Sequence, residues 1–391
     1  MAGNKIVIGV AGAGTMGAGI AQIAASSGHK VIVYDLNDGA LRAALRQIDG
    51  NLGKQLERQS KSFEDRRMTI ARIETTGTLD RLSECEFVVE AVVEELFAKK
   101  ELLRRLEKVV SSTCVLSTNT SSLSVTAISS ALQARERFLG THFFNPATVM
   151  PLVEFVRTEA TSDQTIRSAR ETIEGWGKLS VIVQDTPGFV VNRIARPFYI
   201  EALKILEEGV ADVATIDSAM RQIGGFKMGP FELMDLIGND VNYAVSESIF
   251  ASFYYDPRFR PSHIQRRMVE AGHLGRKSGR GFYEYNGHFQ KPQPGTDQTQ
   301  AQAIADRILF MIFNEAADAV LHRIASVVEI DLAMVKAANY PHGPLQWADE
   351  AGINNVVAGL EALQDEFGDD RYRANPLLKR MAKAGDKFYR S

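Results

Sequence analysis

A histidine and a glutamate twelve residues apart form the first pair in this sequence whose types and spacing could do chemistry. His142 ends an apolar run at 138–142, and Glu154 lies inside a second apolar run at 152–156. A buried glutamate needs a partner, because an unpaired charge in a dry site is costly. A histidine on an adjacent strand could be that partner, and the pair could then act as a general base with an orienting carboxylate. A core histidine beside a structural ion pair fits these residues equally well, so both interpretations stay open at this point.

A glycine-rich turn near the N-terminus could bind phosphate. Residues 12–17 read Gly-Ala-Gly-Thr-Met-Gly and fit G-x-G-x-x-G, between an apolar run at 5–10 and a run of helix formers ending at Gly28. In a dinucleotide-binding fold the first glycine permits a tight turn, the second lets backbone approach a pyrophosphate, and the third permits close helix–strand packing. The pattern predicts dinucleotide binding, with a structural turn as the alternative. The candidate cofactor-binding residues here are Gly12, Gly14, Thr15, Met16 and Gly17.

An acidic residue closes the next apolar run. Asp35 follows residues 31–34 and lies 23 residues after the first glycine of the turn. A carboxylate there can accept hydrogen bonds from both hydroxyls of the adenosine ribose, and it would repel the 2′-phosphate of NADP. Residues 36–38 contain no arginine that could neutralise that phosphate, so the sequence predicts NAD rather than NADP. The alternative is that Asp35 caps the following helix.

The elements that must position these residues alternate between strand and helix. Strands are predicted at 5–10, 31–34, 87–93, 113–118, 138–142, 152–156 and 179–183, and helices at 97–110, 124–132 and 162–175. Residues 38–67 are predicted to form long, heavily charged helical segments, and from 186 onward almost only helical periodicity is found. Such alternation predicts an α/β fold with an N-terminal Rossmann-type doubly wound sheet. Ligands of such sheets bind at the carboxyl ends of the strands, where the polar segments 119–123 and 142–146 lie.

The helical part of the chain contains an internal repeat. At an offset of 114 residues, 217–220 match 331–334 and 229–230 match 343–344, together with further single identities. Such a register is typical of duplicated domains. The sequence therefore predicts a Rossmann-type domain at 1–185 with a helical excursion at 38–67, followed by two all-α domains. These are copy one at 186–290 and copy two at 301–391, with a polar linker at 286–300.

Composition excludes several classes of function. The 391 residues are 45% hydrophobic and 24% charged, which is ordinary for a globular protein, and the net charge of -3 offers no basic field for nucleic acid. No apolar run approaches the ~18 residues that span a bilayer. Two cysteines, Cys85 and Cys114, cannot build a disulfide framework or, alone, a zinc site. The first strand begins at Lys5 and leaves no room for a signal peptide. We therefore expect a soluble protein, cytoplasmic if bacterial, without a metal, membrane or nucleic-acid partner.

Five stretches of the sequence resemble the L-3-hydroxyacyl-CoA dehydrogenase family. They are residues 12–22, 119–123, 140–146, 185–193 and 228–233. The resemblance covers 4–285 continuously, and 301–391 is similar to the second C-terminal domain of two-repeat members. Residues 341–349 look like the bacterial enzymes of phenylacetate and adipate catabolism, which act on 3-hydroxyadipyl-CoA, and also like 3-hydroxybutyryl-CoA dehydrogenases.

The resemblance implies roles for individual residues. His142 matches the family's general base and Glu154 its orienting carboxylate. Ser121 matches the serine that hydrogen-bonds the reacting oxygen beside the nicotinamide, and Asn192 the asparagine that helps hold this oxygen across the domain cleft. Ser122 is instead expected to be the N-cap of the next helix. Further cofactor-contacting positions are matched by Glu94, Lys99, Asn145 and Lys277.

The basic excursion at 42–67 matches a coenzyme A-contacting segment of the family, although a solvated helix face is the usual meaning of such charge. Its candidate residues are Asn51, Lys54 and Arg58, of which the first and last replace a serine and a lysine found in relatives. The implied activity is NAD-dependent interconversion of (S)-3-hydroxyacyl-CoA and 3-oxoacyl-CoA. The alternatives are a dehydrogenase of a free hydroxy acid, such as carnitine or a sugar acid, and a non-catalytic, crystallin-like NAD-binding protein.

The second helical copy is expected to be structural. It lacks the serine, histidine and glutamate of the candidate site, and Asp306 stands where copy one has Asn192. In single-copy relatives the helical domain supplies the dimer interface, so a fused copy could take the partner's place. The chain is therefore expected to be a homodimer or a pseudo-dimeric monomer.

Overall fold

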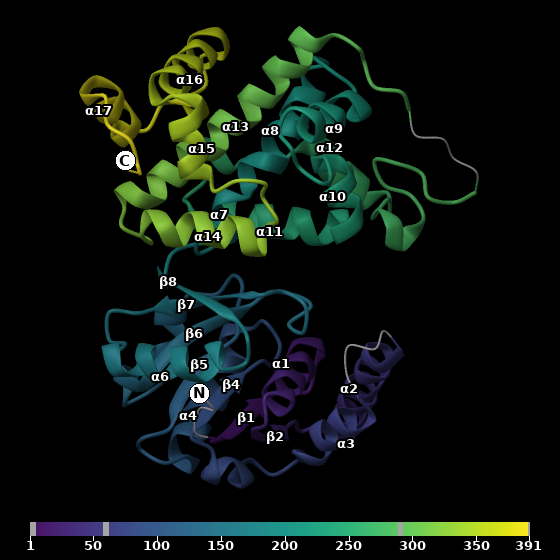
Figure 1. Cartoon of the computed structure of the whole chain (residues 1–391), viewed down its shortest axis with the longest axis vertical. Helices are drawn as coiled ribbons and strands as arrows, with labels where there is room; N and C mark the ends of the chain where they lie inside the picture. Colours follow the sequence, from purple (N-terminus) through teal and green to yellow (C-terminus); the bar gives the residue numbers. More distant parts are fainter. Residues whose placement is uncertain (1–4, 58–61, 288–291, 390–391) are drawn as a thin grey trace. The chain divides into compact units, whose positions relative to one another are not determined.

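The computed structural model describes residues 5–57, 62–287 and 292–389. The chain divides into two compact units, Met1–Thr186 and Pro187–Ser391 (Figure 1). Among the described residues, no helix combines the length and apolar content needed to cross a membrane.

The first unit is built on one sheet of eight strands. The strands are β1 Val7–Ala11, β2 Lys30–Tyr34, β3 Ile73–Thr76, β4 Phe87–Glu90, β5 Val115–Thr118, β6 Phe138–Phe143, β7 Leu152–Arg157 and β8 Leu179–Gln184. Their order is β3-β2-β1-β4-β5-β6-β7-β8, and every neighbouring pair is parallel except β6 and β7. The order reverses between β1 and β4, and the carboxyl ends of strands at such a switch point are where open α/β sheets bind ligands. The predicted α/β fold class is confirmed.

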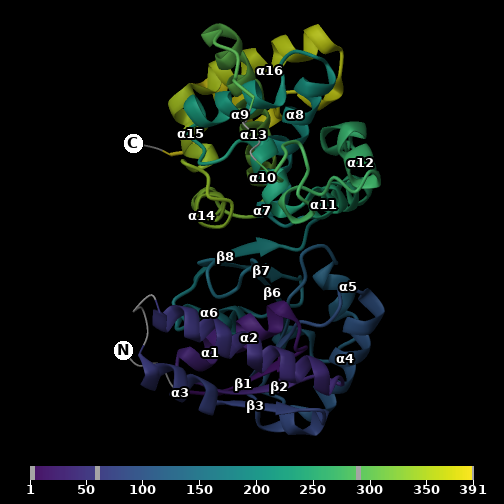
Figure 2. The same cartoon turned by 90° about the vertical axis from the view of Figure 1, so that its right-hand side faces the viewer.

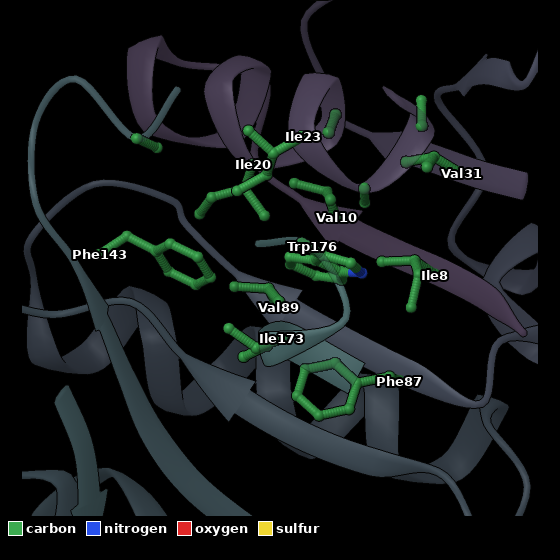
Figure 3. Close-up of a cluster of buried hydrophobic side chains, with 14 of the residues drawn as sticks. Ile8, Val10, Ile20, Ile23, Val31, Phe87, Val89, Phe143, Ile173 and Trp176 are labelled. Carbon is green, nitrogen blue, oxygen red and sulfur yellow. The ribbon is translucent and has the colours of Figure 1, made fainter. Parts of the chain in front are cut away.

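Helices cover both faces of this sheet. They are α1 Thr15–Ser26, α2 Asp38–Glu57, α3 Phe63–Ala71, α4 Leu96–Val109, α5 Val125–Ser129 and α6 Asp163–Glu174. Figure 3 shows one apolar core, in which Ile20 and Ile23 of α1 lie over Val10 of β1, with Ile173 of α6 and Trp176 beside them. Buried strands of this kind read as continuous apolar runs, which is why most of them could be predicted.

The sheet differs from the predicted one in three ways. The edge strand β3 was not expected. The run at 87–93 forms a strand only as far as Glu90, because the Glu90 carboxylate accepts the Val92 N–H at 2.8 Å. Strand β7 is antiparallel to β6, since the connection at 144–151 is shorter than the dozen or so residues that a parallel crossover requires.

In the described residues of the second unit the regular elements are helices, apart from two isolated β-bridges at 275–284. Its helices are α7 Val191–Ile194, α8 Arg196–Glu207, α9 Val213–Gln222, α10 Pro230–Ile237, α11 Asn239–Ser252, α12 His263–Glu270, α13 Gln298–Leu321, α14 Val327–Ala337, α15 Pro344–Ala351, α16 Ile353–Phe367 and α17 Pro376–Ala384. The long helix α13 packs against α8, α9, α15 and α16, which surround it in Figure 2.

Matching aspartates organise the two halves of this unit in the same way. Asp217 accepts hydrogen bonds from the first backbone N–H groups of α10 and from the Tyr283 hydroxyl. Asp331 accepts the equivalent bonds from α15 and from the Tyr389 hydroxyl. The glycine before each helix, Gly229 or Gly343, is required because a Cβ there would lie about 2.3 Å from the aspartate. We infer that the two segments are copies of one domain.

The two copies contact each other reciprocally. In the 114-residue register Arg193 corresponds to Arg307 and Glu201 to Glu315. Arg193 donates to Glu315 at 2.5 Å, and Arg307 donates to Glu201 at 2.6 Å, with all four side chains buried. A contact in which residue i meets j and the equivalent j meets i is the signature of a two-fold interface.

Candidate active site

The glycine-rich turn has the geometry of a phosphate-binding loop. Gly12 has φ +116°, and a Cβ on it would lie 2.5 Å from the carbonyl oxygen of Ala91, so the turn requires glycine. A Cβ on Gly17 would lie 1.9 Å from the Gly12 carbonyl oxygen, which fixes the close approach of α1 to the turn. A Cβ on Gly14, by contrast, would meet open space. The open side at Gly14, next to the N-terminus of α1, fits an approaching pyrophosphate.

Asp35 does not cap the following helix. Asn37 does so, because its side-chain oxygen accepts the N–H groups of Gly39 and Ala40. The Asp35 carboxylate accepts the N–H of Ala13 in the glycine-rich turn at 2.8 Å, which holds the acid beside that turn. The capping alternative is therefore wrong, and Asp35 lies where a ribose-binding acid is expected.

A pocket of about 360 Å³ lies beside Asp35. It is lined by Gly12, Tyr34, Asp35, Leu36, Val92, Val93, Phe97, Ala98, Glu101, Leu102 and Arg105. An apolar slot that ends at a ribose-binding acid suits an adenosine group. The sequence reasoning missed Arg105, since it looked for an arginine only directly after Asp35, whereas this one comes from α4.

Glu94 accepts several hydrogen bonds from the polar loop that follows β5. Its Oε1 atom accepts the Thr120 hydroxyl at 2.6 Å, the Ser121 N–H at 2.9 Å and the Ser122 N–H at 3.2 Å. Burial raises the pKa of Glu94, but the Thr120 hydrogen bond and the positive charge of Lys99 outweigh it, and the resulting pKa is lower than usual. Glu94 is thus held ionised and fixes the backbone that carries Ser121.

Lys99 is buried beneath this loop and does not lie on its exposed surface. Its side chain is 0% exposed, and its ammonium donates to Glu90 at 2.9 Å and to the Asn119 carbonyl at 3.2 Å, with Glu94 at 3.4 Å. Burial raises the pKa of Glu90, and the nearby Lys99 opposes that shift. The sequence reasoning missed Glu90, although an acid inside an apolar strand is the same signal that singled out Glu154.

The N-cap of α5 is Ser124 and not Ser122. The Ser124 hydroxyl accepts the Ala127 N–H at 3.1 Å, and Asp185 supports this helix start by accepting the Ser124 hydroxyl at 2.8 Å. The Ser122 hydroxyl donates instead to Glu94 at 3.1 Å. The prediction for Ser122 is wrong because the backbone bonds to Glu94 delay the start of the helix by two residues.

His142 and Glu154 face each other across two strands. They are directly paired in the antiparallel register of β6 and β7, and His142 Nδ1 lies 2.7 Å from Glu154 Oε2. His142 is 6% exposed and Glu154 is fully buried. The carboxylate accepts, so Nδ1 carries the proton and the lone pair lies on Nε2, which is the tautomer that a general base needs.

Two polar side chains hold the loop after β6. The Asn119 side-chain oxygen accepts the N–H of Phe143, the last residue of β6, at 3.0 Å and ties the start of this loop to the end of β5. Lys178 donates to the carbonyls of Ala147 and Met150 at 2.6 and 2.7 Å, and burial lowers its pKa. Asn145, a predicted cofactor contact, is exposed on this loop.

The second unit contains two of the predicted site residues. Asn192 is half-buried on α7, and Lys277 is exposed and paired with Asp240. Most predicted catalytic and cofactor-binding residues of the first unit lie at or just after the carboxyl ends of β1, β2, β4, β5 and β6, with Lys99 on α4 and Glu154 on β7. The parts played by Asn192 and Lys277 stay predictions.

The candidate coenzyme A residues lie on and after α2. Lys54 is exposed, as are Arg42 and Arg46 on the same helix, while Asn51 donates to Gln22 of α1 at 3.2 Å. Arg58 lies outside the described residues.

Metal-binding and thiol chemistry find no support in the described ranges. No group of three or more His, Cys, Asp or Glu side chains there could hold a metal ion. Cys85 and Cys114 are buried, and burial raises the pKa of each thiol to about 12, so neither is a ready nucleophile.

Comparison with known proteins agrees with this geometry. A model of the NAD-binding domain of 3-hydroxyacyl-CoA dehydrogenase matches residues 7–186, and the model of its C-terminal domain matches 188–285 and 304–390. A 3-hydroxyadipyl-CoA dehydrogenase of Escherichia coli is 36% identical over 97% of this chain and 98% of its own length. A probable 3-hydroxybutyryl-CoA dehydrogenase of Deinococcus radiodurans is 42% identical over 71% of this chain and 99% of its own.

A solved structure extends the likeness to three dimensions. The crystal structure of 3-hydroxybutyryl-CoA dehydrogenase from E. coli gives a TM-score of 0.92 at 35% identity, over 97% of this chain and 99% of that one. The matched N-terminal domain is an NAD-binding domain, so the cofactor is NAD and the protein is an oxidoreductase. The chain belongs to the 3-hydroxyacyl-CoA dehydrogenase family.

Proposed function

We propose that this protein interconverts (S)-3-hydroxyacyl-CoA and 3-oxoacyl-CoA, with His142 as the general base. The observation that carries the proposal is the 2.7 Å bond between His142 Nδ1 and the buried Glu154 carboxylate. The glycine-rich turn and Asp35 would hold NAD, which would supply the hydride acceptor for the 3-carbon of the hydroxyacyl group.

His142 moves the proton. In the oxidation its Nε2 atom takes the proton of the 3-hydroxyl, and Glu154 stabilises the imidazolium that forms. In the reduction the same imidazolium returns the proton to the oxygen. We assign the Ser121 hydroxyl and the Asn192 amide to the task of holding that oxygen, Ser121 being positioned by the bond of its N–H to Glu94.

The coenzyme A part of the substrate is assigned to α2. Arg42, Arg46 and Lys54 are exposed cations on this helix, and none of them forms an ion pair within the described residues. Arg66 and Arg67, by contrast, are paired with Asp49 and Glu64. The phosphate groups of coenzyme A can form ion pairs with these three exposed cations.

Consumption of NADH with acetoacetyl-CoA, 3-oxohexanoyl-CoA and the corresponding free 3-oxo acids tests the proposal. We expect turnover of the coenzyme A thioesters only. His142→Gln should lower kcat by about 10²–10⁴-fold. The affinity for NADH, followed by quenching of protein fluorescence, should be unchanged, because the glycine-rich turn is not altered.

Three outcomes would count against the assignment. Turnover of free 3-oxo acids at the same rate would favour a hydroxy acid dehydrogenase. Tight NADH binding without turnover of any thioester would favour a non-catalytic protein. Full activity of His142→Gln would remove the imidazole from the reaction.

A further inference from the structure

An aromatic side chain packs directly against the imidazole of the candidate base. The ring centroids of Phe144 and His142 are 4.4 Å apart, and the two ring planes are tilted by 50°. Phe144 comes two residues after His142, the separation that places side chains on the same side of an extended chain. His142 is 6% exposed and Phe144 is half-buried. The imidazole therefore has an aromatic neighbour in addition to the Glu154 carboxylate.

The residue between them, Phe143, has different surroundings. It is 3% exposed and belongs to the apolar core of the first unit, where its ring is stacked with that of Trp176 at a centroid distance of 6.3 Å (Figure 3). Phe144 is not one of the residues of this core cluster. Packing of the core thus accounts for Phe143, whereas the contact that Phe144 makes is with the candidate base.

The backbone on both sides of Phe144 is fixed by hydrogen bonds. The Asn119 side-chain oxygen accepts the Phe143 N–H at 3.0 Å, and the Lys178 ammonium donates to the Ala147 carbonyl at 2.6 Å. A ring on a segment that is anchored at both ends keeps its distance from the imidazole without help from a ligand.

An aromatic ring favours the protonated form of a neighbouring imidazole. The face of a phenyl ring carries partial negative charge, and it attracts cations whose centre lies within about 6 Å of the ring centroid. The 4.4 Å separation of Phe144 and His142 is inside that range. The attraction is stronger where water is excluded, as around this buried imidazole. A phenyl ring also has no hydrogen-bond acceptor atom, so it does not compete with the substrate oxygen for Nε2.

In the described part of the chain, few other charges face the imidazole from the elements packed against β6. Neither β5 nor α5 carries a titratable side chain, and those of α6 are exposed or half-buried. Strand β7 carries Glu154 and Arg157, and Arg157 is paired with Asp163 at 2.7 Å. Glu94 and Lys178 are engaged by the loops that follow β5 and β6. A change of the aromatic ring can therefore be measured against a constant set of charges.

We propose that Phe144 is a positioning residue, which stabilises the imidazolium of His142 and holds this ring in place for proton transfer. The inference rests on the proposed function, in which His142 takes the proton of the 3-hydroxyl. Glu154 acts through a hydrogen bond at Nδ1, whereas Phe144 acts on the imidazole through its ring. The two contacts are separate, so removing the aromatic ring should weaken proton uptake without removing the base.

The pH dependence of kcat/KM tests the proposal in both directions of the reaction. Oxidation of (S)-3-hydroxybutyryl-CoA needs the neutral imidazole and is lost on the acid side, whereas reduction of acetoacetyl-CoA needs the imidazolium and is lost on the alkaline side. Phe144→Leu keeps an apolar side chain and removes the aromatic face. The midpoints of both losses should move to lower pH by about half a unit, which is about a threefold change in rate at a fixed pH on either limb.

Further variants separate the aromatic contact from packing. Phe144→Tyr keeps the ring and should leave both midpoints within about 0.2 units of those of the unaltered protein. Val149→Ala changes an exposed side chain of the same loop and should leave the midpoints in place as well. Should Phe144→Leu fail to fold, Phe144→Met, which also lacks an aromatic ring, takes its place with the same expected shift.

The outcomes separate this inference from the proposed function. Full activity of His142→Gln would contradict the proposed function and this inference with it. If His142→Gln is inactive and the midpoints do not move in Phe144→Leu, the inference about Phe144 alone is overturned. A uniform loss of kcat/KM at every pH would describe a structural residue, and a rise in KM alone would describe a substrate contact. Either result would also overturn the inference, as would an equal shift in Phe144→Tyr.

Discussion

Single carboxylates organise the candidate site. Glu154 fixes the tautomer of His142 from the next strand, and Glu94 gathers the loop that carries Ser121. Glu154 is fully buried, where hydrogen bonds are strong and unmet ones are costly, whereas the Glu94 side chain is 37% exposed. The precise placement of two small functional groups thus depends on side chains that need not touch the substrate.

Glu94→Gln tests this positioning role. The amide cannot accept all the bonds that converge on Oε1, and it removes the charge that Lys99 faces. We expect kcat to fall by about tenfold with a smaller change in KM for the acyl-CoA. Steady-state kinetics measure both values, and the exposed neighbouring Glu95→Gln is the matched control.

The lowered pKa of Glu94 predicts how the stability of the same variant depends on pH. Because this pKa is lowered in the folded protein, the ionised carboxylate adds stability above its unfolded pKa of about 4.3. That contribution is lost as pH falls through the lower folded value. The difference in unfolding free energy between the unaltered protein and Glu94→Gln should shrink below about pH 4. A difference that stays constant down to pH 3 would contradict a native carboxylate held by these bonds.

At the scale of elements, most strands could be predicted because buried strands are continuous apolar runs, whereas the helices of the second unit were predicted only as a helical region. The edge strand Ile73–Thr76 was not predicted, since its residues are half-buried and mostly polar. The antiparallel direction of β7 is a property of connection length and sheet pairing, which periodicity does not report. The pairing of His142 with Glu154 was within reach of sequence reasoning, whereas Arg105 was not, because it enters its pocket from a distant helix.

Helix α2 carries a prediction of its own. Lys54→Glu places a negative charge among the exposed cations of this helix, and it should raise KM for acyl-CoA about threefold to tenfold at low salt. The effect should fade as ionic strength rises, because these charges are exposed to solvent. Initial rates at several salt concentrations measure it, with Lys108→Glu on the exposed face of α4 as the control. An equal effect of both substitutions would move coenzyme A recognition away from α2.

At the scale of the whole molecule, the two helical copies form buried ion pairs with each other. Arg193 and Arg307 each reach a glutamate of the other copy, and these side chains are buried. We propose that the face through which a single-copy protein would bind a second chain is used here within one chain. This arrangement supports the pseudo-dimeric monomer among the two expected assemblies.

Sedimentation should therefore give the mass of a single chain. Removing either arginine, as Arg193→Met or Arg307→Met, breaks a buried ion pair, although Arg258 still pairs with Glu315 and Tyr372 still donates to Glu201. The loss of unfolding free energy should be about 1–3 kcal/mol. Denaturant titration measures the loss. Arg266→Ala breaks an exposed pair with Glu270 and should cost at most about 1 kcal/mol. A stable dimer in solution would contradict the assembly.

Covalent fusion also removes a constraint that binds every homodimer. When two identical chains associate, each substitution is made twice, and a charge that suits one half is forced upon the other. In a tandem arrangement the halves vary independently, so a charged side chain can stand in one half while its mirror position stays aromatic, as at Arg196 and Phe310. The second copy can therefore diverge from the first at single positions while the reciprocal contacts between the two copies are kept.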